Sequence, residues 1–133
     1  MSMIEVKTAD LIGPALDWAV DAIESGKPLE IRHHKSGSGE WFFVADGVHY
    51  PSSHRKFSTD WRHGGPLIHK FQVGLLSPKQ SPCGEWHAST LHPDFTDFTH
   101  KDNPLIAAMR AIVASELGDA VQVPAELVNG SAL

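Results

Sequence analysis

Two segments of the chain carry apolar residues at helical spacing, one near each end. The apolar positions of the first are Ala15, Leu16, Trp18, Ala19, Ala22 and Ile23. Their spacing of three or four residues matches one face of an α-helix. Pro14 suits the first helical position, and Gly26 followed by Pro28 is a normal stop. The pattern predicts a helix over residues 14–25.

The second helical pattern begins at Pro104. Its apolar positions are Leu105, Ile106, Met109, Ile112, Val113 and Leu117. Asn103 is a good N-cap residue because its side chain can accept a hydrogen bond from the first turn, and proline is tolerated directly after it. Gly118 follows the last apolar position. We expect a second main helix over residues 104–117.

Outside these two helices, short apolar runs predict strands. They lie at residues 4–7, 29–33, 41–45, 71–76, 85–91 and 121–123. Residues 49–69 and 92–101 show no clear period, and an irregular segment as long as the first is often functional in a small domain. The elements do not alternate regularly between strand and helix. This order predicts an α+β fold, with the two main helices packed on one face of a small, mostly antiparallel sheet.

Composition narrows the class of protein. The chain has 133 residues, of which 41% are hydrophobic, which suits a single domain over residues 1–133. Cys83 is the only cysteine, so no intramolecular disulfide can form, as expected in a reducing cytosol. We see no signal peptide and no apolar run near the ~20 residues that a membrane span needs. We therefore expect a cytoplasmic protein that does not enter a membrane.

The charge pattern argues against nucleic-acid binding. The formal net charge is −5, and the lysines and arginines are dispersed along the chain. Non-specific affinity for nucleic acid needs clustered cations that replace the counterions of the phosphates. The segment from Arg55 to Lys70 is the one locally basic stretch. We expect a protein or a small molecule as partner.

The central segment FSTDWRHGGPLIH (57–69) supports two interpretations. In the structural one, Ser58, Thr59 and Asp60 cap a turn, Trp61 fills the core, and Gly64-Gly65-Pro66 turns the chain into the next strand. In the functional one, the two glycines let backbone amides approach a ligand, and Trp61 offers a stacking face. Asp60 or Arg62 then supplies a polar contact. The spacing is not that of a phosphate-binding P-loop.

Two helical segments add candidates to this site. Two interpretations are open for Asp17 and Trp18 of the first helix. Either both face the same cleft as Trp61, or Trp18 packs in the core and Asp17 is solvated or caps a loop. Arg110 of the second helix is expected to pair with Asp60 or Asp17, because a buried arginine needs a partner. The candidate ligand-binding residues are Asp17, Trp18, Ser58, Thr59, Asp60, Trp61, Arg62, Gly64, Gly65 and Arg110.

Catalytic and metal-binding signatures are weak. The chain has nine histidines, but no HExxH motif and no paired cysteines. Cys83 lies in a Ser-Pro-Cys-Gly turn without the signature of an activated thiol. We therefore expect no catalytic residue, no metal and no cofactor. A metal-dependent hydrolase built on Asp60, His63 and His69 remains an alternative.

Three stretches together resemble a known family. They are LIGPALDWAV (11–20), FSTDWRHGGPLI (57–68) and PLIAAMRAIVASELGDAVQVPAEL (104–127). They are similar to the pattern of the NinX-like family of small phage and prophage proteins, a domain family of unknown function. The chain departs from that family at His69-Lys70, where members usually continue with polar residues or a glutamate-arginine pair. The resemblance implies a phage or prophage protein in a bacterial cytoplasm, and it implies no established catalytic activity.

We expect a non-enzymatic phage accessory protein that binds a host protein or a small ligand through residues 57–68. One alternative is a sponge or degrading enzyme for a nucleotide-like defence signal, with the base on Trp61 and the phosphate near Gly64, Gly65 and Arg62. A homodimer would suit the spare aromatic residues, although no residue pattern specifies one.

Overall fold

The computed structural model describes residues 2–26, 30–33, 41–45, 48–51, 56–90 and 98–129. In chain order the elements are β1 (Met3–Lys7), a 3-10 turn (Thr8–Asp10), α1 (Gly13–Ser25), β2 (Glu30–His33), β3 (Trp41–Ala45), β4 (Val48–Pro51), α2 (Trp61–Lys70), β5 (Gly74–Leu76), β6 (Trp86–Ser89), β7 (Phe98–His100), α3 (Pro104–Leu117), β8 (Ala120–Pro124) and α4 (Ala125–Asn129). The prediction of an α+β fold with main helices near 14–25 and 104–117 is confirmed.

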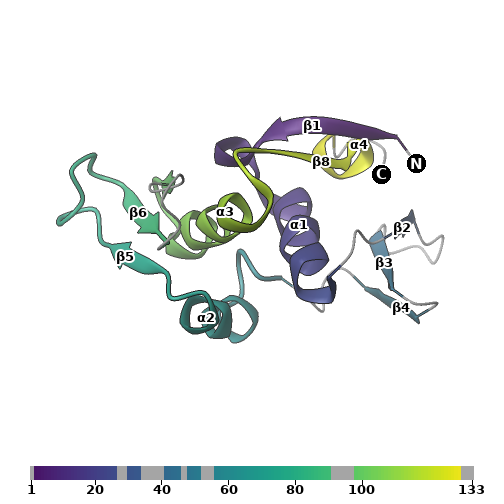
Figure 1. Ribbon diagram of the computed structural model, residues 1–133, viewed down its shortest axis with the longest axis horizontal. Coiled ribbons are helices and arrows are strands. Elements are labelled where there is room, and N and C mark those ends of the chain that lie inside the picture. Colours follow the sequence, from purple (N-terminus) through teal and green to yellow (C-terminus); the bar gives the residue numbers. More distant parts are fainter. Residues whose placement is uncertain are drawn as a thin grey trace.

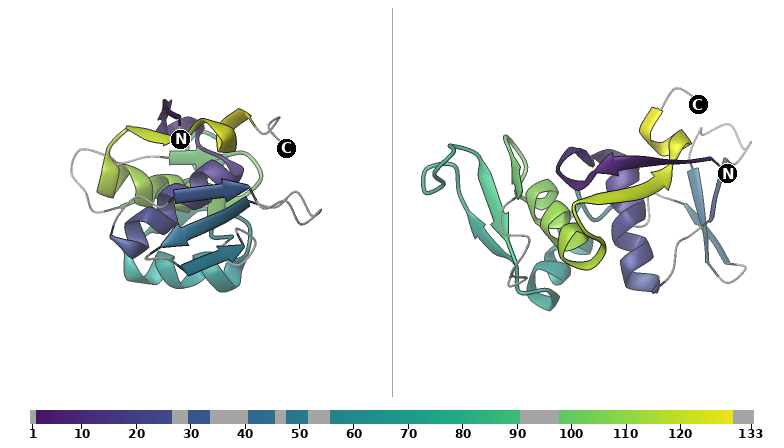
Figure 2. Two further views of the ribbon diagram at one scale, coloured as in Figure 1. Left: turned by 90° about the vertical axis from the view of Figure 1, so that its right-hand side faces the viewer. Right: turned by 45° about the horizontal axis from the view of Figure 1, so that its top comes forward.

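The strands of the described ranges form three small antiparallel sheets, where we expected one. β1 pairs with β8, β2-β3-β4 form a second sheet, and β5-β6-β7 form a third. Figure 1 shows the two three-stranded sheets at opposite ends of the molecule, with α1 and α3 between them. The β1–β8 ribbon runs along one side of these helices, as the second view in Figure 2 also shows.

The core lies where α1 and α3 meet. Leu16 and Val20 of α1 and Met109 and Ile112 of α3 are fully buried. Every residue of α3 from Leu105 to Ala114 is buried, and this stretch is apolar except for Arg110, so the helix needs cover on all sides. Helices α1 and α2 and strands from two separate sheets supply that cover.

The segment from residue 61 to residue 70 corrects the prediction of an irregular loop with a turn at Gly-Gly-Pro. It is helix α2, and Gly64, Gly65 and Pro66 lie inside it. Asp60 caps the helix, because its side chain accepts a hydrogen bond of 2.9 Å from the Arg62 backbone N–H. Packing of the apolar face then outweighs the poor helix propensity of glycine and proline.

The strands differ from the prediction in smaller ways. Because the helix continues to Lys70, strand β5 begins at Gly74, later than the expected residue 71. β4 and β7 lie in stretches that we expected to be irregular. The strands predicted at residues 4–7 and 121–123 are confirmed and pair with each other, with Ile4 opposite Val123.

Candidate functional site

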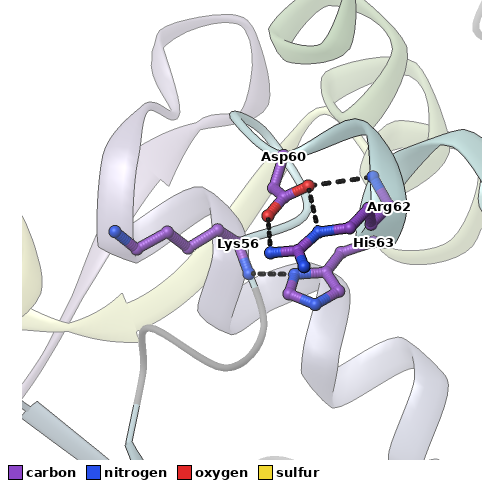
Figure 3. Close-up of polar contacts among 4 residues, drawn as sticks. All are labelled: Lys56, Asp60, Arg62 and His63. Carbon is purple, nitrogen blue, oxygen red and sulfur yellow. Dashed lines mark hydrogen bonds and ion pairs between the residues drawn. The ribbon is translucent and has the colours of Figure 1, made fainter.

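The Asp60 carboxylate is held by Arg62 at the start of α2 (Figure 3). Besides the backbone bond, the Arg62 guanidinium donates to Asp60 Oδ1 at 3.3 Å and to Oδ2 at 2.9 Å. The side-chain and backbone hydrogen bonds from Arg62 lower the pKa of Asp60 to about 2. The acid is therefore ionised at neutral pH, and both of its oxygens have partners within the same turn.

Trp61 and Arg62 form the exposed surface of this turn. Trp61 is 54% exposed, whereas Trp18 in α1 is only 3% exposed. The Arg62 side chain is 84% exposed even though it is paired with Asp60. The structural interpretation is thus correct for Asp60 as a cap, but wrong for Trp61 as a core residue.

The two glycines of α2 have different surroundings. An added Cβ at Gly64 would overlap the Phe57 carbonyl oxygen and lie 2.9 Å from Leu105 Cδ2. At Gly65 it would meet only the Trp61 ring, at an ordinary contact distance of 3.7 Å. The Gly64 N–H also donates to the Asp60 carbonyl oxygen, at 2.9 Å. Gly64 therefore lets α2 pack closely against its neighbours, and its amide is already used inside the helix.

The turn before α2 is tied to both main helices. The Ser58 backbone N–H donates to Asp17 Oδ1 of α1 at 2.9 Å. Asn103, the N-cap of α3, donates from Nδ2 to the Ser58 carbonyl oxygen at 3.3 Å. The Lys56 backbone N–H donates to His63 Nδ1 at 3.1 Å (Figure 3). Three segments far apart in the chain thus meet at Ser58.

Asp17 is the buried acid of this region. It is 7% exposed, and burial raises its pKa to about 6, although the hydrogen bonds of Ser58 and the positive charge of Lys56 oppose that rise. It lines a cavity of about 230 Å³ together with Gly13, Pro14, Lys56 and Thr59. Of the candidates, the structure brings Asp17, Ser58 and Thr59 together, next to the turn that begins at Asp60.

Trp18 and Arg110 lie elsewhere. Trp18 lines a separate, mainly apolar cavity of about 460 Å³ between α1, the end of α3 and β8. Arg110 is buried and donates from Nε to the Leu11 carbonyl oxygen at 2.7 Å and from a terminal nitrogen to the Thr99 carbonyl oxygen at 2.8 Å. The predicted ion pair with Asp60 or Asp17 is therefore wrong. Backbone carbonyls satisfy the guanidinium, and burial lowers the pKa of Arg110.

The described residues contain no group of three histidine, cysteine, aspartate or glutamate side chains that could hold a metal ion. His63 Nδ1 already accepts the Lys56 N–H, and the Asp60 carboxylate is already bonded to Arg62. These ligand atoms of the hydrolase hypothesis are therefore engaged within the protein. Within the same ranges, no helix is both long and apolar enough to cross a bilayer.

Sequence reasoning missed four residues of the site. Gly13, Pro14 and Lys56 line the cavity beside Asp17, and Asn103 fixes Ser58. Asn103 and Pro14 were recognisable as helix-start residues, but nothing in the sequence placed either one beside Ser58 or Asp17. Lys56 carried no signal beyond its charge.

A family model matches most of the chain. The family model described as Bacteriophage P22, NinX matches residues 7–116, which include α1, the Ser58 turn, α2 and nearly all of α3. A search of curated proteins finds no match.

Proposed function

The chain belongs to the phage P22 NinX family, and from that premise we propose that it is a phage accessory protein that binds a host protein. The binding surface is the Trp61 face, which we define as the side chains of Trp61 and Arg62 at the start of α2. The proposal places the protein in the bacterial cytoplasm, with its host partner, and requires no catalysis.

The observation that carries this proposal is the exposure of Trp61. A tryptophan ring in water forgoes the free energy that burial of its large apolar surface would release. Tryptophan and arginine are also the residues most enriched among those that dominate binding energy at protein interfaces. Here the two are neighbours, and more than half of the Trp61 surface is exposed.

The Trp61 face is also preorganised. The Asp60 carboxylate holds the Arg62 side chain, so less conformational entropy is lost when a partner contacts it. Leu67 is buried, and Gly64 brings α2 close to Leu105 of α3, which fixes the helix on the core. An exposed aromatic ring and a cation held by its ion pair, on one helical turn, suit a flat protein surface.

The same geometry gives less support to a nucleotide-like ligand. Trp61 lines neither the 230 Å³ cavity nor the 460 Å³ cavity, so neither of these cavities offers a base a place to stack on its ring. The Gly64 amide already donates within the helix, so it does not point freely at a phosphate. A thermal-shift screen with nucleotides tests this alternative, because a ligand specific for the folded state raises the Tm.

Site-specific photocrosslinking tests the proposed function. We would replace Trp61 with a photoreactive phenylalanine analogue in phage-infected host cells, and use exposed Lys79 as the matched control position. We expect a discrete host-protein adduct from position 61 that is absent from position 79 and that excess unlabelled protein suppresses. Trp61→Ala protein should fail to suppress it. Equal labelling from both positions would overturn the proposal, and an adduct of two copies of the chain would indicate a homodimer.

A further inference from the structure

The cavity beside Asp17 is lined by one acidic side chain, Asp17, and one basic side chain, Lys56, which form no ion pair with each other. It lies between the first turn of α1, with Gly13, Pro14 and Asp17, and the segment before α2, with Lys56 and Thr59. Its volume of about 230 Å³ is below the roughly 300–1,000 Å³ typical of drug-sized ligand pockets. An occupant would therefore be small, about the size of an amino acid.

One oxygen of the buried acid accepts no hydrogen bond from the part of the chain that the structure describes. Asp17 Oδ1 accepts the Ser58 N–H, but no hydrogen bond from the described residues reaches Oδ2. Burial raises the pKa of Asp17 to about 6 because the charged form loses water, although the hydrogen bonds of Ser58 oppose that rise. Within the described residues, Oδ2 is the carboxyl oxygen that is left for a further donor.

Lys56 supplies the opposite charge without satisfying Asp17. Its positive charge lowers the pKa of Asp17, yet no ion pair joins its ammonium to any described residue. The side chain is exposed, and its backbone N–H is already used by His63. An anionic group at the mouth of the cavity would therefore find a cation free to contact it.

The start of α1 also favours an anion there. Its N-cap position is Ile12, whose side chain makes no capping hydrogen bond. The positive end of the helix dipole is thus not offset by a capping side chain, and Gly13 and Pro14 form part of the cavity wall. The start of α1 would therefore attract the anionic end of a ligand, in addition to the attraction from Lys56.

We propose that this cavity binds a small zwitterion, with its ammonium group on Asp17 Oδ2 and its carboxylate against Lys56 and the start of α1. Such a ligand completes both ion pairs at once. The proposal is independent of the Trp61 face, because neither Trp61 nor Arg62 lines the cavity.

Backbone amide NMR of the full chain tests the proposal directly. We would titrate glycine, β-alanine and γ-aminobutyrate, which vary the separation of the two charges, with acetate and methylammonium as ligands that carry one charge each. The Ser58 amide reports on the site because it is bonded to Asp17. We expect saturable shifts at Ser58 with at least one of the three zwitterions, at a Kd at least ten-fold lower than for either single-charge ligand. No saturation at tens of millimolar, or equal binding of acetate, would overturn the proposal.

Two variants assign the contacts. Asp17→Asn keeps an oxygen for the Ser58 bond, and should weaken zwitterion binding at least ten-fold. Lys56→Gln changes an exposed side chain, and should weaken binding several-fold while removing the preference for a carboxylate on the ligand. Lys79→Gln is the matched control and should bind like the wild type. If Asp17→Asn failed to fold, Lys56→Gln would still test the proposal, because unchanged zwitterion binding by that variant contradicts it.

Discussion

Asp17 accepts a hydrogen bond from Ser58 and Asp60 follows Ser58 by two residues, and their surroundings shift their pKa values in opposite directions. Asp60 is accessible to water and paired with Arg62, and its pKa is lowered to about 2. Asp17 is buried against the same turn, where the Ser58 N–H donates to it, and burial raises its pKa to about 6. Burial without a full set of partners disfavours the charged form, whereas a cationic donor favours it.

This difference separates two kinds of candidate site. Around Asp60 the polar groups satisfy one another, so the acid supports the Trp61 face, for which we propose a protein partner. Around Asp17 the buried acid and exposed Lys56 form no ion pair with each other, and the zwitterion that we propose would contact both. The changes below break or sharpen this comparison, beginning with the largest expected effect.

The first change removes the close packing that supports the Asp60 region. Gly64→Ala should destabilise the protein by about 2–3 kcal/mol, because the added methyl overlaps the Phe57 carbonyl oxygen and crowds Leu105. Gly65→Ala is its matched control. It should stabilise the protein by about 0.5–1 kcal/mol, since alanine is a better helix former and the new methyl meets only the Trp61 ring. Urea unfolding measures both, and equal effects at the two positions would contradict our account of Gly64.

The second change removes the ionisation of Asp17. The folded-state pKa of about 6 lies above the ordinary value of 3.8, so the folded state holds its proton more tightly and the wild type loses stability as pH rises between these values. Asp17→Asn avoids that loss. It should be more stable than the wild type by roughly 2–3 kcal/mol above pH 7. The advantage should shrink as pH falls towards 4, and a constant difference across this range would rule out the assigned cause.

The third change removes the charge of Asp60 and should have the smallest effect. The folded-state pKa of about 2 lies below the ordinary value of 3.8, so ionised Asp60 stabilises the fold above pH 3.8, and that stabilisation disappears as pH falls towards 2. Asp60→Asn keeps a capping side chain but loses the ion pair with exposed Arg62. We expect a loss of a few degrees in Tm at pH 7 that vanishes near pH 2. A deficit that persists at pH 2 would point to lost capping instead.

The helices and the site differed in how far local sequence could predict them. α1 and α3 were predictable because apolar spacing, proline starts and glycine stops agree within each segment. α2 was not, because Gly64, Gly65 and Pro66 are poor helix residues, and its stability depends on contacts with Phe57 and Leu105, which lie outside the helix. The division into three sheets likewise depends on which strands pair, and β1 pairs with β8 from the other end of the chain.

The site shows the same limit at the level of single residues. The sequence identified Asp17, Ser58 and Thr59 as candidates, but it paired Arg110 with a carboxylate, whereas the structure pairs it with the carbonyl oxygens of Leu11 and Thr99. Backbone carbonyls are present at every position, so no residue type marks the ones that a buried arginine will reach.

The sequence by itself determined the α+β class, the two main helices and the resemblance to the NinX family, because periodicity, caps and short motifs are local or linear properties. Only the tertiary structure decided that Trp61 is exposed while Trp18 is buried, and that Asp17 bonds to Ser58 beside a cavity lined by Lys56. Exposure and charge pairing depend on which distant segments exclude water from a side chain, and no stretch of sequence carries that information alone.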